Sequence, residues 1–248
     1  MILKTLICNI LRLYVRYFPV RKGKIPILGM FERLGVFQNM ELNTRIAGHT
    51  RVLLDIDDWV QRLVYFFGVY ENEKVETKLW VEYAAKSNHI LDIGSNFGYY
   101  SLLASDVNPA CKILAFEPAP AMFKRLTHNL TINSYDNVVP LNLGVSNREG
   151  VFDFFVADSK HSGMSGLSMP DIVGGQKIQV DVTTIDQILV EHRNFIPELI
   201  KIDVEGNELN ALMGMEQMIS SSKPVFFIEI YDSNLAKFGH SRDMVFDF

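Results

Sequence analysis

The chain contains little cysteine and no excess of basic residues, and both absences narrow what it can do. Its two cysteines, Cys8 and Cys111, lie too far apart in the sequence to form a metal-binding or redox motif. A reducing compartment is the simpler expectation, so we predict a cytoplasmic protein. Acidic residues outnumber basic residues by 29 to 24, which gives a net charge of −5. Because nucleic-acid-binding domains usually carry a basic excess, we expect no nucleic-acid partner.

Long hydrophobic runs are also absent from the N-terminal segment. Residues 1–24 contain six basic residues and no acidic one, and their longest uncharged run is 5–11. This run is far shorter than the about 20 residues that a spanning helix needs. Arg12 and Arg16 interrupt the apolar core that a secretory signal would require. Two interpretations stay open: a helix packed on the domain with solvated basic residues, or an interfacial helix in peripheral contact with an anionic membrane.

The rest of the chain shows no internal repeat, so its organisation follows from its strand and helix patterns. A length of 248 residues and a hydrophobic content of 48% favour one α/β domain with an appendage. We assign residues 1–58 to the basic amphipathic segment and an irregular lead-in over 19–58, and residues 59–248 to the main domain. Apolar residues at helical spacing in 59–86 predict two helices that cap the ligand site or cover the sheet.

From His89 onward, strands and helices alternate. This pattern predicts a parallel sheet with helices on its faces and a ligand site at the carboxyl ends of the strands. Two further strands, 151–156 and 177–182, form an insertion after the third strand, and the Ser/Gly-rich loop 157–176 between them has a length typical of functional loops. The five main strands are expected at 89–94, 112–117, 138–145, 199–204 and 224–230.

Two neighbouring strand ends carry the chemistry that identifies a ligand. The first strand ends in Asp92-Ile-Gly94, and the second ends in Glu117. A dinucleotide fingerprint would need glycines where Asn96 and Tyr99 stand, so this turn does not suit a diphosphate. A carboxylate beside the turn suits a cation, and an acid after the next strand suits a ribose diol; S-adenosylmethionine offers both. The competing interpretation is an ordinary α/β turn with two solvated acids.

Five stretches occur in a fixed order along the chain: LDIGSNFGYYS (91–101), AFEP (115–118), GVSN (144–147), IKIDVEGNE (200–208) and PVFFIEI (224–230). With these stretches the chain resembles the FkbM family of S-adenosylmethionine-dependent methyltransferases. The resemblance implies a Rossmann-like class I methyltransferase fold, with a mostly parallel twisted sheet and helices on both faces. It also implies O-methylation of a hydroxyl on a sugar, a glycan or another small-molecule acceptor. The cofactor-binding residues that we predict are Asp92, Gly94, Ser95, Asn96, Gly98, Tyr99, Glu117, Pro118 and Gly144.

The chain departs from the family pattern at its C-terminal end. Only 17 residues follow Tyr231, whereas the family fold continues there with a helix and a terminal β-hairpin. We therefore expect the hairpin to be missing and the chain to be truncated or a fragment. The rival prediction for function follows from this: a catalytically inactive module or fragment that binds S-adenosylmethionine without turning it over.

Methyl transfer needs an acceptor oxygen aligned with the methyl carbon and a group that removes its proton. The fourth strand places Asp203 and Glu205 at its carboxyl end, on the face shared with Lys201. We predict that Asp203 faces the cofactor or substrate and that Glu205 is the general base or orients the acceptor. Alternatively, both acids only bind backbone amides of the following turn or cap the next helix.

Two less favoured alternatives concern other candidate groups. Asp203, Glu229 and Asp232 would form a Mg²⁺ site if the three carboxylates converged, although Glu229 is equally consistent with a structural residue paired with Lys201. His161 in the Ser/Gly-rich loop has a side chain suited to a base, but an exposed loop histidine is the simpler interpretation. We expect acceptor specificity to reside in the 157–176 loop and the N-terminal segment.

Overall fold

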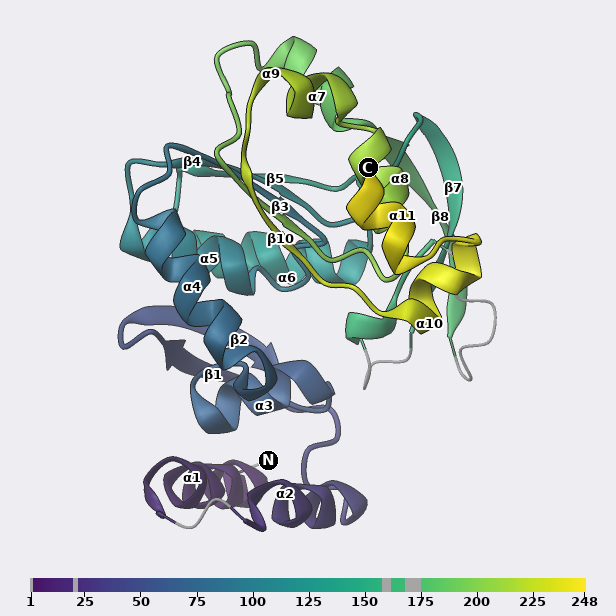
Figure 1. Cartoon of the computed structure of the whole chain (residues 1–248). Coiled ribbons are helices and arrows are strands. Elements are labelled where there is room, and N and C mark those ends of the chain that lie inside the picture. The colour runs from purple at the N-terminus through teal and green to yellow at the C-terminus, as the bar shows by residue number, and fades with distance from the viewer. Residues whose placement is uncertain (1, 20–21, 158–161, 168–174) are drawn as a thin grey trace.

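The computed structural model describes residues 2–19, 22–157, 162–167 and 175–248. A parallel sheet with the strand order β10-β9-β3-β4-β5 forms its centre (Figure 1). The chain moves outward from β3 to β5 and then crosses to β9 on the other side of β3. Ligands bind at such a reversal, which predicts a site at the carboxyl ends of β3 and β9. The strands are β3 (His89–Ile93), β4 (Lys112–Phe116), β5 (Val138–Leu141), β9 (Leu199–Ile202) and β10 (Val225–Ile228).

Helices cover both faces of this sheet, which confirms the predicted fold class. Because side chains alternate along a strand, Ile90 and Ile113 pack into one core, whereas Leu91 and Leu114 pack into the other. The first core is covered by α4 (Lys74–Ala84), α5 (Tyr99–Val107) and α6 (Pro120–Thr131), and the second by α7 (Ile185–Glu191), α8 (Glu208–Met213) and α9 (Glu216–Ser221) (Figure 1). After β10 come α10 (Asp232–Leu235), η3 (Ala236–Phe238) and α11 (Arg242–Asp247), and Leu235 and Val245 from the two helices pack into the second core.

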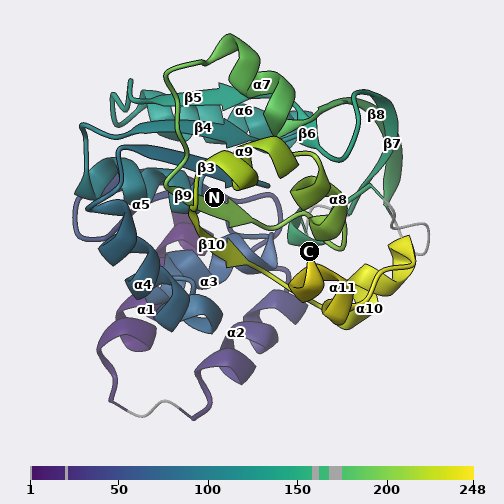
Figure 2. The same ribbon diagram turned by 45° about the horizontal axis from the view of Figure 1, so that its top comes forward.

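The expected third strand, 138–145, is wrong as a single element. β5 ends at Leu141, and the Asn142 side chain then donates hydrogen bonds to the carbonyls of Glu117 (2.8 Å) and Pro118 (3.0 Å), which turns the chain out of the ladder. The next residues form β6 in a second sheet, which lies beside the main one (Figure 2). The predicted inserted pair of strands is confirmed and completes that sheet. Its elements are β6 (Gly144–Val145), β7 (Gly150–Val156) and β8 (Gln176–Thr183), with η2 (Ser162–Met164) between β7 and β8.

The irregular lead-in expected over 19–58 is also wrong. It contains a helix, α2 (Lys24–Arg33), and an antiparallel hairpin of β1 (Glu41–Ile46) and β2 (Thr50–Asp55). Every second residue of β2 points inward, and Val52 and Leu54 are buried in the first core. The two helices predicted before the first core strand are confirmed as α3 (Trp59–Phe67) and α4, joined by η1 (Glu71–Glu73).

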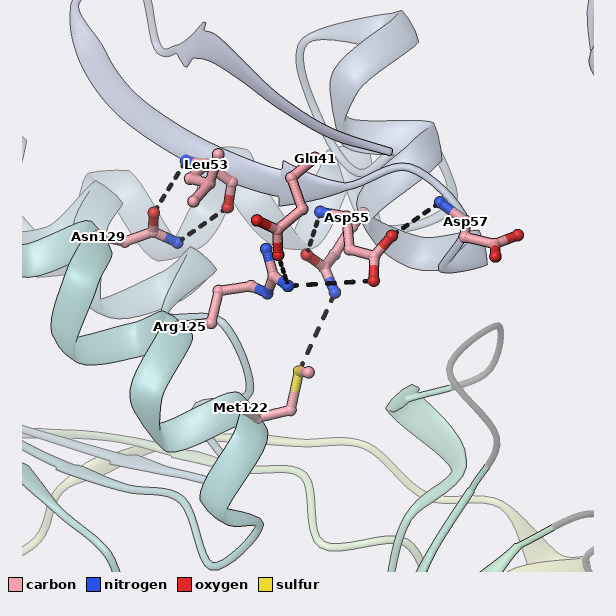
Figure 3. Close-up of polar contacts among 8 residues, drawn as sticks. Glu41, Leu53, Asp55, Asp57, Met122, Arg125 and Asn129 are labelled. Atoms are coloured by element: carbon pink, nitrogen blue, oxygen red, sulfur yellow. Dashed lines mark hydrogen bonds and ion pairs between the residues drawn. The ribbon is translucent and has the colours of Figure 1, made fainter. Parts of the chain in front are cut away.

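The hairpin is attached to α6 by polar contacts, which Figure 3 shows. Arg125 on α6 pairs with Glu41 (2.6 Å) and lies 3.9 Å from Asp55. The Asn129 side chain is buried, and its Oδ1 accepts a hydrogen bond from the backbone N–H of Leu53 (2.8 Å). A buried polar side chain is stabilising only when it is bonded in this way. These contacts fix α6, whose first turn lies beside the candidate site.

Candidate active site

The turn after β3 brings two strand ends into backbone contact. Gly94 has a φ of +84°, and a Cβ atom at this position would lie 1.8 Å from the carbonyl oxygen of Asp203. No other residue fits, because any side chain would overlap the backbone that follows β9. The amide groups of Gly94 and Ser95 both donate to the carbonyl of Phe116, at 3.0 and 2.9 Å. One turn thus connects the ends of β3, β4 and β9.

Glu117 lies directly after β4 and is held by the same turn. Its two carboxylate oxygens accept hydrogen bonds from the backbone N–H groups of Asn96 and Ala119, both at 2.8 Å. Burial raises the pKa of Glu117 to about 7, against the lowering effect of these two bonds. Each carboxylate oxygen keeps acceptor capacity beyond its single backbone bond, so the group is positioned without being saturated.

A narrow cavity of 70 Å³ opens over Glu117, and we call it the Glu117 cavity. Most of its walls are apolar, which suits a planar base, and Glu117 supplies a fixed acceptor at one end. Gly94, Asn96 and Asp203 form the side that faces the strand ends. The apolar residues of its wall are Ile93, Phe116, Pro118, Met122, Leu143, Val145, Phe154, Leu167 and Val204.

A larger cavity of 370 Å³ adjoins the first one, and we call it the acidic cavity. The two share Gly94, Asn96, Asp203 and Glu205 in their linings. Carboxylates and aromatic rings dominate the acidic cavity, and they come from segments far apart in the chain. The acids are Glu73, Asp203, Glu205 and Glu229, and the aromatic residues are Trp59, Tyr70, Phe97, Tyr99, Tyr100 and Tyr231.

Lys201 lies behind these acids as a buried cation. Its ammonium donates to Asp203 (3.1 Å) and lies 4.6 Å from the centre of the Tyr100 ring. Burial alone would lower the pKa of Lys201, but the neighbouring carboxylates Asp203, Glu73 and Glu229 outweigh it and raise that pKa above its usual range. Lys201 therefore stays charged and places a buried positive charge beside Asp203.

Glu205 and Glu229 take up protons more readily than ordinary glutamates. Burial, reinforced by repulsion from Asp203, raises the pKa of Glu205 to about 9 and that of Glu229 to about 8. The positive charge of Lys201 lowers the pKa of Glu229 and partly offsets this rise. Glu205 has a φ of +54°, and its Oε2 accepts a hydrogen bond from the Asn234 side chain (2.6 Å).

Most residues of this arrangement lie in a part of the chain that matches a known protein family. The family model described as the methyltransferase FkbM domain matches residues 92–248, which include Glu117 and the acids that follow β9 and β10. The chain belongs to the FkbM family. Glu73 and the aromatic residues of α3 lie before the matched range, so the acidic cavity combines the FkbM domain with the segment that precedes it.

Several curated proteins are similar to part of this FkbM chain. Hexuronic acid methyltransferase AglP of Haloferax volcanii is 28% identical over 144 residues, which cover 58% of this chain and 56% of the relative. The 31-O-demethyl-FK506 methyltransferase FkbM of Streptomyces tacrolimicus is 27% identical over 156 residues, covering 51% of this chain and 59% of the relative. The chain therefore spans somewhat more than half the length of these relatives. A crystal structure of methyltransferase FkbM from Methylobacillus flagellatus has a TM-score of 0.45 and 19% identity, over 73% of this chain and 47% of that one.

Most of the predicted cofactor-binding residues reach the two cavities of the FkbM domain. Ser95 and Tyr99 line the acidic cavity. The Tyr99 hydroxyl also accepts a hydrogen bond from the backbone N–H of Tyr70 (3.1 Å), which joins the domain to the segment before α4. Gly94 and Asn96 line both cavities, and Glu117, Pro118 and Gly144 line the Glu117 cavity.

Asp92 and Gly98 are absent from the described lining of either cavity. Asp92 lies on the face of β3 that packs against α5, where its buried carboxylate accepts a hydrogen bond from the Ser101 hydroxyl. It is also the register neighbour of Lys201 on β9. Gly98 precedes α5 and faces α6, so that a Cβ atom there would lie 2.7 Å from Leu126 Cδ1. The side chains of β3 alternate between the two faces of the sheet, and this places Asp92 beneath α5. The residue motif alone does not tell which face a helix covers.

The predicted catalytic acids Asp203 and Glu205 both border the junction of the two cavities. The backbone N–H of Gly206 in the turn after β9 is bound instead by Glu208, whose Oε1 accepts from it at 2.9 Å. The three acids proposed for Mg²⁺ do not converge, because Asp232 pairs with Arg242 (3.1 Å) at an exposed position. Among the described residues, no group of three or more acidic, histidine or cysteine side chains is placed to hold a metal ion. His161 lies outside the described residues.

Residues that precede the matched FkbM domain also line the acidic cavity, and the sequence analysis did not identify them individually. The partly buried carboxylate of Glu73 accepts a hydrogen bond from the Tyr100 hydroxyl, and this burial raises its pKa. Trp59 and Tyr70 add aromatic walls to the acidic cavity. The only sequence feature that indicated these residues is the pair of helices predicted over 59–86, which we expected to cap the site. Nothing in the residue spacing distinguishes Glu73 from Glu71.

Proposed function

We propose that this chain transfers a methyl group from S-adenosylmethionine to a hydroxyl of a sugar, a glycan or another small-molecule acceptor. The observation that supports this most is the junction of two cavities at Gly94, Asn96 and Asp203, one suited to a nucleoside and one to a hydroxylated molecule. Membership of the FkbM family agrees with it. Two relatives, a hexuronic acid methyltransferase and a 31-O-demethyl-FK506 methyltransferase, favour an acceptor with hydroxyl groups.

The residues of the Glu117 cavity suit the nucleoside part of the cofactor. Glu117 would accept hydrogen bonds from the ribose diol, since its carboxylate is already fixed by Asn96 and Ala119 and keeps free acceptor capacity. Pro118 and Phe154 would flank the base. The cavity is smaller than a nucleoside, so side chains of its wall have to move aside when the ligand enters, as is common on binding. When bound, S-adenosylmethionine supplies an electrophilic methyl group on a sulfonium.

The acidic cavity supplies the groups that handle the acceptor proton. Asp203 accepts a hydrogen bond from the Lys201 ammonium and borders both cavities, which makes it the candidate to accept a proton from the acceptor hydroxyl at a carboxylate oxygen. Glu205, with its pKa raised to about 9, carries a proton at neutral pH and is suited to orient the acceptor by donating a hydrogen bond. Orienting the acceptor is one of the two roles expected for Glu205 from the sequence, whereas the role of base passes to Asp203, which was expected to face the cofactor or substrate.

Calorimetry with S-adenosylmethionine and with sinefungin tests the cofactor site. Glu117→Gln keeps the volume and one carbonyl oxygen but loses the charge, so affinity should fall by about 1.5–3 kcal/mol, the range for a hydrogen bond to a charged group. Glu149→Gln, at an exposed position after β6, is the matched control and should bind like the wild type. Equal affinity of Glu117→Gln and the wild type would remove Glu117 from the ribose site.

Turnover is measured separately, by mass spectrometry of the products formed from a panel of hydroxylated acceptors and a host-cell extract. A new methylated product that depends on Asp203 would support methyl transfer, with Asp203→Asn as the test variant. Tight cofactor binding with no methylated product from any acceptor would instead favour a binding module without catalysis.

A further inference from the structure

The N-terminal helix α1 (Ile2–Tyr17) presents an apolar stripe to the outside of the molecule. Its inner face buries Cys8, Leu11 and Val15 in the first core. Every exposed position of the described helix except Asn9 carries an apolar or aromatic side chain. These residues recur at intervals of three and four, so they lie on one side of the helix. They are Ile2, Leu3, Leu6, Ile10, Leu13 and Tyr17.

The basic residues of this region point the other way, which reverses the expectation of solvated basic side chains. Lys4 donates to the carbonyl of Gly35 (2.7 Å), and Arg16 donates to that of Tyr65 (3.0 Å). Arg12 donates to the Thr44 hydroxyl (3.0 Å). These partners are neutral, and no recorded ion pair joins the three cations to a carboxylate of the described residues. Their positive charges therefore lie behind the apolar stripe, on the half-buried side of α1, and add to the basic character of this end of the chain.

The second helix also carries exposed apolar side chains. α1 and α2 lie at the end of the molecule farthest from the α7–α9 layer (Figure 1). Ile25, Met30 and Leu34 on and after α2 are exposed. Seven of the 24 basic residues but only one of the 29 acidic residues occur in 1–33, although the whole chain carries a net charge of −5. An exposed apolar surface of this kind usually marks an interaction site.

We propose that α1 and α2 form a membrane-contact surface that rests on an anionic lipid bilayer. Leu6, Ile10 and Leu13 enter the boundary between headgroups and acyl chains, and the net positive charge of residues 1–33 attracts the anionic headgroups. A second copy of this chain fits the surface less well, because a symmetric contact would bring two strongly cationic segments together. No helix of the described residues is long and apolar enough to cross the bilayer, so the contact stays on one leaflet.

Vesicle co-sedimentation with the full chain tests this surface. Vesicles of phosphatidylcholine mixed with an equal part of phosphatidylglycerol should bind the protein, vesicles of phosphatidylcholine alone should bind it at least about tenfold more weakly, and added salt should release it. The triple variant L6S/I10S/L13S removes side chains that are 54, 58 and 60% exposed. Because these positions are exposed, folding should be unaffected, and binding to the anionic vesicles should fall by at least about tenfold.

A matched variant controls for the loss of exposed apolar area. V151S/V190S/I196S removes side chains that are 63, 54 and 60% exposed, on β7, on α7 and just after it, away from α1 and α2. It should bind the vesicles like the wild type. Circular dichroism on both triple variants checks that they fold.

The depth to which α1 enters the bilayer is measured independently with a tryptophan introduced on its exposed side. Anionic vesicles with brominated acyl chains should quench the fluorescence of the tryptophan introduced in Ile10→Trp. They should not quench the tryptophan introduced in Val151→Trp. The proposal is overturned if the wild type does not bind anionic vesicles, or if both triple variants bind these vesicles equally well. A wild-type dimer in sedimentation analysis that L6S/I10S/L13S dissociates, without vesicle binding by the wild type, would make the surface a contact between copies instead.

Discussion

The Glu117 cavity and the acidic cavity meet at one turn, yet different interactions hold them. In the Glu117 cavity, two backbone N–H groups fix a single carboxylate and apolar side chains form the wall. In the acidic cavity, Asp203, Glu73 and Glu229 lie near the buried ammonium of Lys201, and Glu205 is the fourth carboxylate of the wall. The first arrangement depends on a backbone conformation, whereas the second depends on a balance of charge and protons. Substitutions should therefore affect the two cavities in different ways.

The largest effect is expected where the backbones of the two cavities touch. Gly94→Ala would place a Cβ atom 1.8 Å from the Asp203 carbonyl at a φ of +84°. Overlap and backbone strain together should lower the free energy of unfolding by about 3 kcal/mol or more and abolish cofactor binding. Urea denaturation measures the first effect, and calorimetry measures the second.

Gly29→Ala is the matched control for that change. Gly29 lies within α2, where an added Cβ atom meets nothing within 4 Å. Alanine there should raise the free energy of unfolding by up to about 1 kcal/mol, because glycine is the poorer helix former. A Gly94→Ala protein as stable as the wild type would show that the backbone contact at the junction does not constrain the site.

A smaller effect is expected from removing the charge balance of the acidic cavity. Lys201→Met leaves Asp203 and its neighbours without their buried cation, which should cost about 3 kcal/mol of unfolding free energy near neutral pH. The loss should shrink at acid pH, where the carboxylates are protonated and need no cation. Urea denaturation across pH measures both.

The control for Lys201 is an exposed ion pair of similar length. Lys177 pairs with Asp153 at 2.7 Å between β8 and β7, with both side chains exposed. Lys177→Met should change the free energy of unfolding by less than about 1 kcal/mol, because solvent screens such a pair. Equal losses for the two lysine variants would contradict the importance of burial around Lys201.

The smallest effect concerns the protons of the acidic cavity. The pKa of Glu205 is raised from 4.5 to about 9 and that of Glu229 from 4.5 to about 8, so the folded state binds more protons than the unfolded chain between these values. Their contribution to stability is complete below pH 4.5 and is lost as pH rises through 8 and 9. Wild-type stability should fall over this window by on the order of 1–3 kcal/mol.

Glu205→Gln isolates this contribution, because glutamine does not titrate. Relative to the wild type, the variant should become more stable as pH rises from 5 to 9, whereas Glu149→Gln should follow the wild-type curve. Thermal unfolding at several pH values gives the comparison. Parallel curves for Glu205→Gln and the wild type would show that Glu205 is not buried in the way the structure indicates.

The two cavities also differ in how far the sequence predicts them. The residues of the Glu117 cavity follow strand ends and one turn, so local patterns were enough to name Gly94, Asn96, Glu117 and Pro118. The end of β5 could not be predicted in this way, because Asn142 leaves the ladder to bind carbonyls 24 and 25 residues earlier in the chain. The hairpin of 41–55 was missed for a related reason, since its buried side packs on α6 and the first core.

By itself the sequence determined the alternation of strands and helices from His89 onward, the parallel sheet and the acids at its carboxyl edge, because these depend on periodicity and on residues close together in the chain. The tertiary structure decided that Asp92 lies beneath α5, that Glu73 joins the acidic cavity and that α1 turns its apolar side outward. Each of these depends on which distant segment covers a given face. Alternating or helical spacing defines two faces of an element, but only packing against the rest of the chain decides which face is buried.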